Sequence, residues 1–375
     1  MKILSVITGI GYGHATRQEA ILKELKKQGA EIIVASYGTA FNFFEHYYHT
    51  LEIDGPQVSE KKFEFKLLKT LFMNLKLPYY YLKNYFKLRR LVKAFNPDII
   101  ISDFEPLPLF MSKDIPHFLF FNFDPELYKE YVTQGYKRYF SQRKYINWVY
   151  KRAKKISAPI IIPTFEKSAS NEVTYINPIV RPLPERSQKA LLEKLNLSKP
   201  PILIMFGGSY FSTSLLYKIQ EILPQINEKF IIFTYKLSGE SYKNVTFLPF
   251  KENFLEYLKA SKAIITQAGH STLSESVILK KPSLIFPIPN YLEHAVNSYW
   301  AKKKKIAVIK NPKHLTEEAV LKIIQNFVNS LPDMEKSLSN LNIEPNGAEQ
   351  AANLIIEKYK SLKPESDTEH KSPAP

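Results

Sequence analysis

The residues most able to do chemistry lie between Ile264 and Asn297, which reads I-I-T-Q-A-G-H-S-T-L-S-E-S-V-I-L-K-K-P-S-L-I-F-P-I-P-N-Y-L-E-H-A-V-N. This pattern predicts a strand, a glycine turn, a helix, a second strand and then an acidic residue beside a histidine. A turn at Ala268-Gly269 lets the backbone approach a ligand, and the start of the following helix offers unpaired amide donors and a positive dipole end to an anion. We therefore predict a diphosphate site formed by Gly269, His270, Ser271 and Thr272.

Further polar residues extend this prediction from a diphosphate to a sugar nucleotide. Glu275 lies one turn into the predicted helix, where its carboxylate can accept hydrogen bonds from a ribose diol. Glu293 and His294 follow the second strand, where they can contact sugar hydroxyls. Gly208 and Ser209 end another predicted strand in a glycine loop, which either turns the chain or closes the phosphate cradle from the opposite side.

A second glycine loop near the N-terminus, T-G-I-G-Y-G-H-A-T-R, ends in a histidine and an arginine. Its spacing is G-x-G-x-G-H rather than G-x-G-x-x-G, and no acidic residue ends the next predicted strand, so a nicotinamide cofactor is not expected. The loop instead exposes His14 at the carboxyl end of the first strand, where sheets of this kind bind ligands. Because histidine titrates near neutrality, His14 is a candidate general base, and the alternative is a purely structural histidine.

Asp103 follows the predicted strand P-D-I-I-I-S and should lie at the same edge of the sheet as His14. If the two side chains meet, the carboxylate fixes the ring tautomer and stabilises the imidazolium formed on proton uptake. The alternative is that Asp103 caps the following turn. Asp103 and Glu105 also have the spacing of an acidic metal site, but the chain supplies no matching ligands, so no metal is expected.

The overall composition limits the possible functions. At 375 residues, 45% of them hydrophobic, the chain exceeds what one core usually serves, so two domains are expected. The absence of cysteine excludes disulfides, thiolate metal sites and a cysteine nucleophile. No stretch approaches the roughly 20 apolar residues that a membrane-spanning helix needs, and no export signal precedes the first glycines. We therefore expect a soluble protein that stays in the cytoplasm.

Positive charge is concentrated in two segments of the first half. The formal net charge is +16; residues 61–93 hold ten Lys or Arg against the single acid Glu64, and residues 129–155 hold nine against Glu130. Aromatic and aliphatic residues are interleaved with these bases. This mixture suits an anionic membrane surface better than a nucleic acid. The alternative is that the segments are ordinary amphipathic helices that cover their own core.

Short apolar runs alternate with helical stretches along the chain, which predicts parallel sheets covered by helices. Three prolines fall within Asn177–Glu185, the best linker candidate. We predict a first domain over 1–180 with a basic, aromatic helical insertion broken at Pro78, a second domain over 181–345, a helix over 346–362 and a disordered tail over 363–375. The predicted strands are Lys2–Ile7, Glu31–Ser36, Asp98–Ser102, His117–Asn122 and Ala158–Ile162, then Ile202–Phe206, Phe230–Tyr235, Val245–Leu248, Ala263–Thr266, Ser283–Pro287 and Ile306–Ile309.

Taken together, these motifs resemble the two-Rossmann-domain glycosyltransferases, the GT-B architecture, over nearly the whole chain. The likeness is greatest to the group that contains the bacterial enzyme adding N-acetylglucosamine to lipid I and the plant galactolipid synthases. That family's glycine loop with histidine corresponds to Gly9 to Arg17, and the aspartate of its dyad ends a strand that here runs from Pro97 to Asp103. The resemblance implies an α/β fold with two Rossmann-like domains facing each other across a cleft. It also implies that the catalytic residues are His14 and Asp103 and that the acceptor loop contains Gly11, Gly13 and Arg17.

The second-half motif resembles the signature of uridine-diphosphate (UDP) sugar transferases, H-C-G-x-x-S-x-x-E followed by D-Q. By that resemblance Gln267 and Thr272 face the diphosphate, Glu275 faces the ribose, and Glu293 with His294 faces the donor sugar. The chain departs from the pattern at Gln267, where many relatives have histidine, and at His294, where they have glutamine. Retaining relatives carry a glutamate eight positions before the ribose glutamate. Since Gln267 occupies that position here, inversion is favoured.

The resemblance implies an inverting transferase that needs neither metal nor cofactor, with a UDP-sugar as donor. The expected acceptor is lipid-linked or otherwise amphiphilic, the expected location is the inner face of the membrane as a peripheral protein, and no nucleic-acid partner is expected. Two alternatives remain open. One is a UDP-sugar hydrolase or epimerase of the same architecture, since one group of such hydrolases also uses a G-x-G-H-x-x-R loop. The other is a non-catalytic subunit that recruits a partner to the membrane.

Overall fold

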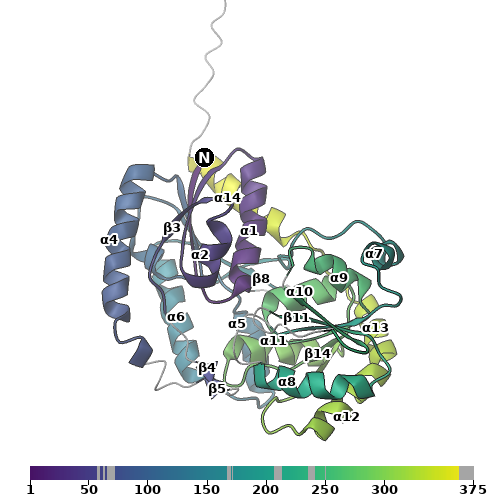
Figure 1. Ribbon diagram of the computed structural model, residues 1–375. Helices are drawn as coiled ribbons and strands as arrows, with labels where there is room; N and C mark the ends of the chain where they lie inside the picture. The colour runs from purple at the N-terminus through teal and green to yellow at the C-terminus, as the bar shows by residue number, and fades with distance from the viewer. Residues whose placement is uncertain are drawn as a thin grey trace, which may run out of the picture.

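The computed structural model describes residues 1–56, 60–61, 64–65, 72–166, 170, 172–206, 213–234, 241–249 and 251–362. Gly208, Ser209 and the predicted tail over 363–375 lie outside these residues. Two parallel sheets dominate the described part, each flanked by helices (Figure 1). The larger has the strand order β3-β2-β1-β6-β7-β8-β9, and the smaller has the order β12-β11-β10-β13-β14-β15. The α/β fold class with two such sheets is confirmed.

The strands match the predicted ones closely, with β3 and β9 as additions at the edges of the first sheet. Their bounds are β1 Lys2–Ile7, β2 Glu31–Ser36, β3 His49–Glu52, β6 Ile99–Asp103, β7 His117–Phe120, β8 Ile160–Pro163, β9 Thr174–Ile176, β10 Ile202–Met205, β11 Phe230–Thr234, β12 Val245–Pro249, β13 Ala263–Thr266, β14 Ser283–Ile285 and β15 Ala307–Ile309.

Helices connect most consecutive strands, as parallel pairing requires. Their bounds are α1 Tyr12–Lys27, α2 Gly38–Phe44, α4 Leu77–Phe95, α5 Pro125–Thr133, α6 Phe140–Lys155, α7 Gln188–Lys194, α8 Thr213–Ile222, α9 Phe254–Ala260, α10 His270–Ile278, α11 Leu292–Lys303, α12 Glu317–Asn329, α13 Leu331–Ser339 and α14 Gly347–Leu362, with 3₁₀ turns at Leu107–Phe110 and Leu223–Gln225.

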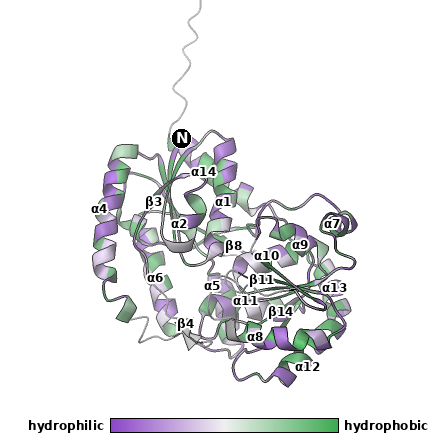
Figure 2. Cartoon of the chain, viewed as in Figure 1, coloured by the Kyte–Doolittle hydropathy of each residue, from purple (hydrophilic) through white to green (hydrophobic). Residues whose placement is uncertain are grey.

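Each sheet is buried on both faces, which explains why its strands are continuous apolar runs rather than alternating ones. Every residue of β6 is buried, for example, as is every residue of β10. The covering helices are two-faced: α8 and α12 alternate hydrophobic with hydrophilic residues (Figure 2). Their apolar sides, including Ile219 and Ile324, pack together with Ile204 of β10.

Both sheets reverse their strand order beside their first strand, between β1 and β6 and between β10 and β13. In open parallel sheets, ligands bind at the carboxyl ends of the strands at such a reversal. The register pairs Ile7 with Asp103 in the first sheet and Met205 with Thr266 in the second. The loops that follow these four strand ends are therefore the expected ligand-binding loops.

The basic, aromatic segment over 61–93 is only partly the helical insertion that was predicted. Glu60–Lys61 and Glu64–Phe65 form a short antiparallel pair, β4 and β5, and the helix α4 begins only at Leu77. Phe72 and Met73 are helical, the chain turns at 74–76 and α4 follows, so the break lies just before Pro78. Pro78 lies in the first turn of α4, where the missing N–H costs nothing and the fixed φ favours helix initiation.

The last helix, α14, returns to the first sheet and packs along α1, with Ala351, Ala352 and Ile355 in the same core as Ile21 and Leu25. It begins at Gly347, which is buried against the segment joining β9 to α7. A Cβ atom at Gly347 would lie 2.0 Å from the carbonyl oxygen of Asn177. Only glycine therefore allows the backbone to approach so closely.

We expect Gly347→Ala to destabilise the protein by about 1–3 kcal/mol, because the added methyl group forces the start of α14 away from Asn177. Urea unfolding followed by circular dichroism measures the change. Glu357→Ala, at an exposed position of the same helix, is the matched control and should stay within about 0.5 kcal/mol of the wild type. Equal stability of the two variants would show that the contact can relax without cost.

Candidate active site

The sharp turn after β1 brings His14 to the crevice between β1 and β6. Gly9 lies where a Cβ atom would come within 1.8 Å of a carbonyl oxygen of the segment after β2. Gly11 has a φ of 78°, in the left-handed region that favours glycine. Because the loop is this tight, α1 starts at once and places the His14 side chain, 12% exposed, beside Asp103.

The structure brings His14 and Asp103 together as predicted from their positions at the sheet edge. Nδ1 of His14 lies 2.9 Å from Oδ1 of Asp103. A ring whose Nδ1–H donates to the carboxylate keeps the lone pair of Nε2 free to take a proton.

Phe104 follows Asp103 in the turn after β6; its φ is 57°, and its ring stacks on Phe121 with 4.1 Å between the ring centroids. Such a conformation is uncommon for a bulky residue and persists only where the surroundings impose it.

Arg17 completes a buried cluster with Asp103 and His14. Its Nε donates to Oδ2 of Asp103 at 3.1 Å and its Nη2 donates to Oδ1. Burial by itself would raise the pKa of the Asp103 carboxyl, but the charges of Arg17 and His14 outweigh it and lower the pKa below its usual value. The predicted acceptor-loop residues therefore lie in different surroundings. Gly11 and Gly13 are partly or fully exposed, whereas Arg17 is buried and turned towards Asp103.

Sequence reasoning missed this role of Arg17, although the signal was present. Arg17 follows His14 by three residues, so the two side chains lie on the same face of α1. A basic residue three positions after a candidate histidine base, in a chain with a neighbouring strand that ends in aspartate, indicates a partner for the carboxylate.

Helix α10 of the second sheet meets the start of α1. Oγ of Ser271 donates to the carbonyl oxygen of Gly13 at 3.1 Å. Ser271 and Thr272 occupy the second and third helical positions, whose N–H groups have no partner within a helix. Both residues are half-buried, as are Gly269 and Gln267 in the preceding turn. The predicted anion-binding helix end thus lies directly against the loop that carries His14.

The His270 ring does not face this helix end. It is buried, stacks on Phe165 at 4.8 Å, and Phe165 in turn stacks on Trp300 at 4.2 Å. Burial lowers the pKa of His270 to about 3, so the ring is neutral and supplies no charge to a phosphate. The backbone N–H of His270 donates to Oε1 of Glu293 at 3.3 Å.

Glu275 is buried and already holds a partner. Nε of Arg181 donates to Oε1 at 2.7 Å, and Nη2 of Arg181 donates to Oε2 at 2.8 Å. Arg181 belongs to the segment that joins the two sheets, so this forked pair ties that segment to α10. A ribose diol at Glu275 would have to share the carboxylate oxygens with the guanidinium or displace it.

Glu293 and His294, the last predicted pair, lie at the start of α11 close to the start of α10. Oε1 of Glu293 accepts from the backbone N–H of His270 at 3.3 Å and from Nδ2 of Asn122, in the loop between β7 and α5, at 3.4 Å. Oε2 accepts from the Tyr291 hydroxyl at 3.2 Å. Nδ1 of His294 accepts from the backbone N–H of Ile288 at 3.1 Å.

Further contacts between the halves hold this arrangement. Leu292 and Val296 of α11 pack into the core formed by α5 and α6. The Tyr299 hydroxyl and Nζ of Lys303 both donate to Oε1 of Glu130 at 2.7 Å. The predicted sites of the two halves therefore lie together at the facing carboxyl ends of the two sheets.

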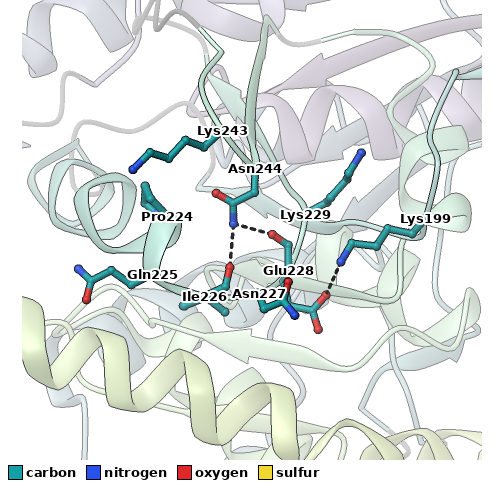
Figure 3. Close-up of a pocket in the computed structure, with 9 residues that line it drawn as sticks. All are labelled: Lys199, Pro224, Gln225, Ile226, Asn227, Glu228, Lys229, Lys243 and Asn244. Carbon is teal, nitrogen blue, oxygen red and sulfur yellow. Dashed lines mark hydrogen bonds and ion pairs between the residues drawn. The ribbon is translucent and has the colours of Figure 1, made fainter.

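Other features of the surface do not match this chemistry. Figure 3 shows a hollow lined by Pro224, Glu228 and Asn244, at the amino ends of β11 and β12 and so at the opposite edge of the sheet. Nδ2 of Asn244 is used there to bind three backbone carbonyls. Across the described ranges, no three His, Asp or Glu side chains gather as a metal-binding group.

A family model described as "Glycosyl transferase family 1" matches residues 1–332. The chain belongs to this family. It is 27% identical over 319 residues to an uncharacterized glycosyltransferase of Methanosarcina acetivorans, a match that covers 80% of this chain and 82% of the relative. The protein is thus a glycosyltransferase.

Two further similarities agree with the GT-B fold. The glycosyltransferase is 22% identical over 375 residues to the UDP-N-acetylglucosamine–N-acetylmuramyl-(pentapeptide) pyrophosphoryl-undecaprenol N-acetylglucosamine transferase of Natranaerobius thermophilus, covering 91% of this chain and 95% of the relative. It superposes on Acinetobacter baumannii MurG with a TM-score of 0.62 and 17% identity, covering 95% of this chain and 99% of the other. At that identity the structural likeness establishes the fold alone.

We expect Arg17→Met to destabilise the glycosyltransferase by about 3–5 kcal/mol at pH 7, because it leaves the buried Asp103 charge without its main partner. The pKa of Asp103 is depressed in the folded protein, so the pair stabilises above the unfolded pKa near 4 and loses this effect as pH falls further. Without Arg17 that pKa rises, and the stability gap between variant and wild type should narrow as the pH falls from 7 to 4. Urea unfolding at pH 7 and at pH 4 measures the difference in the free energy of unfolding between the variant and the wild type.

Arg17→Lys is the matched control, since it keeps the charge and loses the planar fork; it should lie between the wild type and Arg17→Met. A gap below about 0.5 kcal/mol at pH 7, or one that does not change with pH, would contradict the role given to Arg17.

Proposed function

We propose that this glycosyltransferase moves a sugar, with inversion, from a UDP-sugar to a hydroxyl of a lipid-linked or otherwise amphiphilic acceptor at the cytoplasmic face of a membrane. The observation that carries the proposal is the contact of α10 with the first turn of α1, which bears His14, through Ser271 and Gly13 at 3.1 Å. It puts a candidate base and a candidate anion-binding helix end on the two sides of one site.

The proposed reaction is a single displacement. Nε2 of His14 takes the proton of the acceptor hydroxyl while its oxygen forms a bond to the anomeric carbon, and the bond from that carbon to the diphosphate oxygen breaks. Attack from the face opposite the leaving group inverts the anomeric centre. Asp103 accepts from Nδ1 of His14 and stabilises the imidazolium. Because Arg17 already balances Asp103, the cluster is neutral before the step and carries one positive charge after it.

The leaving diphosphate gains negative charge as that bond breaks. The N–H groups of Ser271 and Thr272 and the positive end of the α10 dipole are fixed in place to meet it. Preorganised donors of this kind need no rearrangement during the reaction. We propose that they replace a metal ion in this role and that no cofactor takes part.

We expect His14→Ala to lower transfer by roughly 10²–10⁴-fold while nucleotide affinity stays close to that of the wild type, since the residue belongs to the first sheet and the nucleotide binds the second. Release of UDP from a panel of UDP-sugars, with and without membrane lipid extract, measures turnover; calorimetry with UDP measures binding. His46→Ala, which removes a histidine that is 71% exposed, is the matched control. Wild-type turnover in His14→Ala would refute the mechanism.

The same assay separates the remaining alternatives. UDP release that requires lipid extract supports transfer. Fast release without any acceptor supports hydrolysis, in which water takes the acceptor's place at His14. Binding without turnover under either condition supports a non-catalytic subunit.

The amphiphilic acceptor is proposed because α4 has two apolar faces. One face, including Leu88 and Val92, packs on the first sheet. The other carries Tyr79, Leu82 and Phe86, at three- and four-residue spacing, and these side chains are 64%, 56% and 48% exposed. In Figure 1, α4 runs along the outer side of the first sheet, away from α10. A helix that covers only its own core needs one apolar face, so the second favours an apolar surface outside the protein.

A second exposed aromatic group lies near the start of α6. Phe140 and Trp148 are 65% and 48% exposed, and Trp148 stacks on the exposed Phe110 at 5.8 Å. Lysines and arginines surround both groups, as anionic headgroups require. No helix in the described ranges is both long enough and apolar enough to cross a membrane. The N. thermophilus relative, named for an undecaprenol-linked substrate, also supports a lipid-linked acceptor.

We expect the glycosyltransferase to sediment with anionic vesicles and not with zwitterionic ones, and high salt should weaken this binding without abolishing it because the aromatic contacts are not screened. Replacing Lys76, Arg89, Arg90 and Lys93 by glutamine should reduce it, at about 1 kcal/mol per base near the surface. Lys83 and Lys87 are left intact, because Lys83 pairs with Asp54 and Lys87 bonds the Glu52 carbonyl.

The matched control replaces Lys302, Lys310 and Lys336, exposed bases around the second sheet, which should leave vesicle binding unchanged. Nucleotide binding should be the same in all variants. Equal binding to neutral vesicles, or no binding to anionic ones, would return α4 to the role of an ordinary solvated helix.

A further inference from the structure

His294 carries one hydrogen-bond donor whose position is fixed. Because Nδ1 accepts from the backbone N–H of Ile288 at 3.1 Å, the ring proton resides on Nε2. Nε2 lies 4.0 Å from the position that a Cβ atom at Gly269 would take, and the described residues place nothing else within 4 Å of that position apart from its chain neighbours. The donor therefore lies beside the open space over Gly269, at the residue before α10 begins.

The surroundings of His294 keep its ring neutral. His294 is 6% exposed and packs against the Tyr291 ring at 4.9 Å. Burial lowers the pKa of the ring to about 3, so it does not become an imidazolium at physiological pH. Within the described part of the chain, no acceptor lies within hydrogen-bond distance of Nε2. This N–H lies beside the start of α10, where the oxygen of a bound ligand can accept from it.

The chemistry of the donor favours one kind of ligand oxygen. A protonated Nε2 can donate and cannot accept, which matches a phosphate oxygen, an acceptor only. A sugar hydroxyl also needs a group that accepts its proton, and the neighbouring Glu293 is that kind of group. The phosphate nearest the sugar is the β-phosphate of a nucleoside-diphosphate sugar.

We propose that Nε2–H of His294 donates to a β-phosphate oxygen of the bound nucleoside diphosphate, beside the N–H groups of Ser271 and Thr272. This inference rests on the proposed function and changes one part of it. His294 moves from the sugar, where the sequence resemblance put it, to the leaving group. The residue thus stabilises the departing diphosphate without adding a positive charge.

The test compares a nucleoside diphosphate with its monophosphate by calorimetry, using whichever of UDP, TDP and ADP the wild type binds most tightly. His294→Ala should weaken diphosphate binding by about 10–100-fold, the loss expected for a hydrogen bond to a charged group, and should change monophosphate binding by less than about twofold. His294→Gln should retain most of the affinity, because its amide can accept from Ile288 and still donate. His46→Ala is the matched control.

Unchanged diphosphate affinity in His294→Ala, with weaker binding only of the diphosphate sugar, would put His294 back at the sugar and overturn the inference. An equal loss for the monophosphate and the diphosphate would also overturn it. These outcomes differ from failure of the proposed function, in which the wild type itself binds no nucleoside diphosphate and both proposals fall.

A second measurement does not depend on the folding of any variant. In wild-type protein labelled with ¹⁵N at histidine, the His294 ring should show the Nε2-protonated tautomer, and its Nε2 resonance should move on addition of the diphosphate and not of the monophosphate. His294→Gln identifies the resonance by its loss. A resonance that does not respond to saturating diphosphate would overturn the inference.

Discussion

A carboxylate with no access to solvent must have its charge balanced within the protein, and the geometry of this site depends on how that is done for Asp103. Arg17 and His14 both come from the first turns of α1, so balancing Asp103 fixes α1 against the end of β6. These contacts require the tight glycine loop, because α1 can reach Asp103 only if it starts directly after β1. The contact of Gly13 with Ser271 then passes this placement on to α10 and to the second sheet.

The two sides of the site treat charge in opposite ways. On the first-sheet side, ionised groups are paired, so that His14 can take up a proton next to a carboxylate that is already balanced. On the second-sheet side, both buried histidines are neutral, since burial holds the pKa of His270 and of His294 near 3. In the proposed mechanism, anion binding there depends on N–H groups with fixed directions. Donors of this kind hold a diphosphate by geometry, and their strength does not vary with pH near neutrality.

The region around α4 shows how one helix can serve two environments. Its buried side, with Asn84 and Leu88, anchors it to the first sheet, and Nδ2 of Asn84 bonds the carbonyl of Asp54 at 2.6 Å. Its outer side keeps aromatic and aliphatic residues among bases. Because the anchoring contacts use the inner face and the cations Lys83 and Lys87, the outer face is free of any role in the core. Because the two faces of α4 are separate, contact of the outer face with another surface would not disturb the packing of the inner face.

The sequence by itself determined the two parallel sheets, nearly all their strands and the residues at their carboxyl ends, because buried parallel strands are continuous apolar runs and their ends carry glycine and polar residues. It could not determine what only the packed chain decides. The pairing of Arg181 with Glu275 joins residues 94 positions apart, so no local pattern indicates it. The sequence likewise does not indicate that the His270 ring is buried in the core, or which ring nitrogen of His294 is the donor. The direction of a side chain and the partner of a charge depend on which surfaces meet, and that is settled only when the two sheets are brought together.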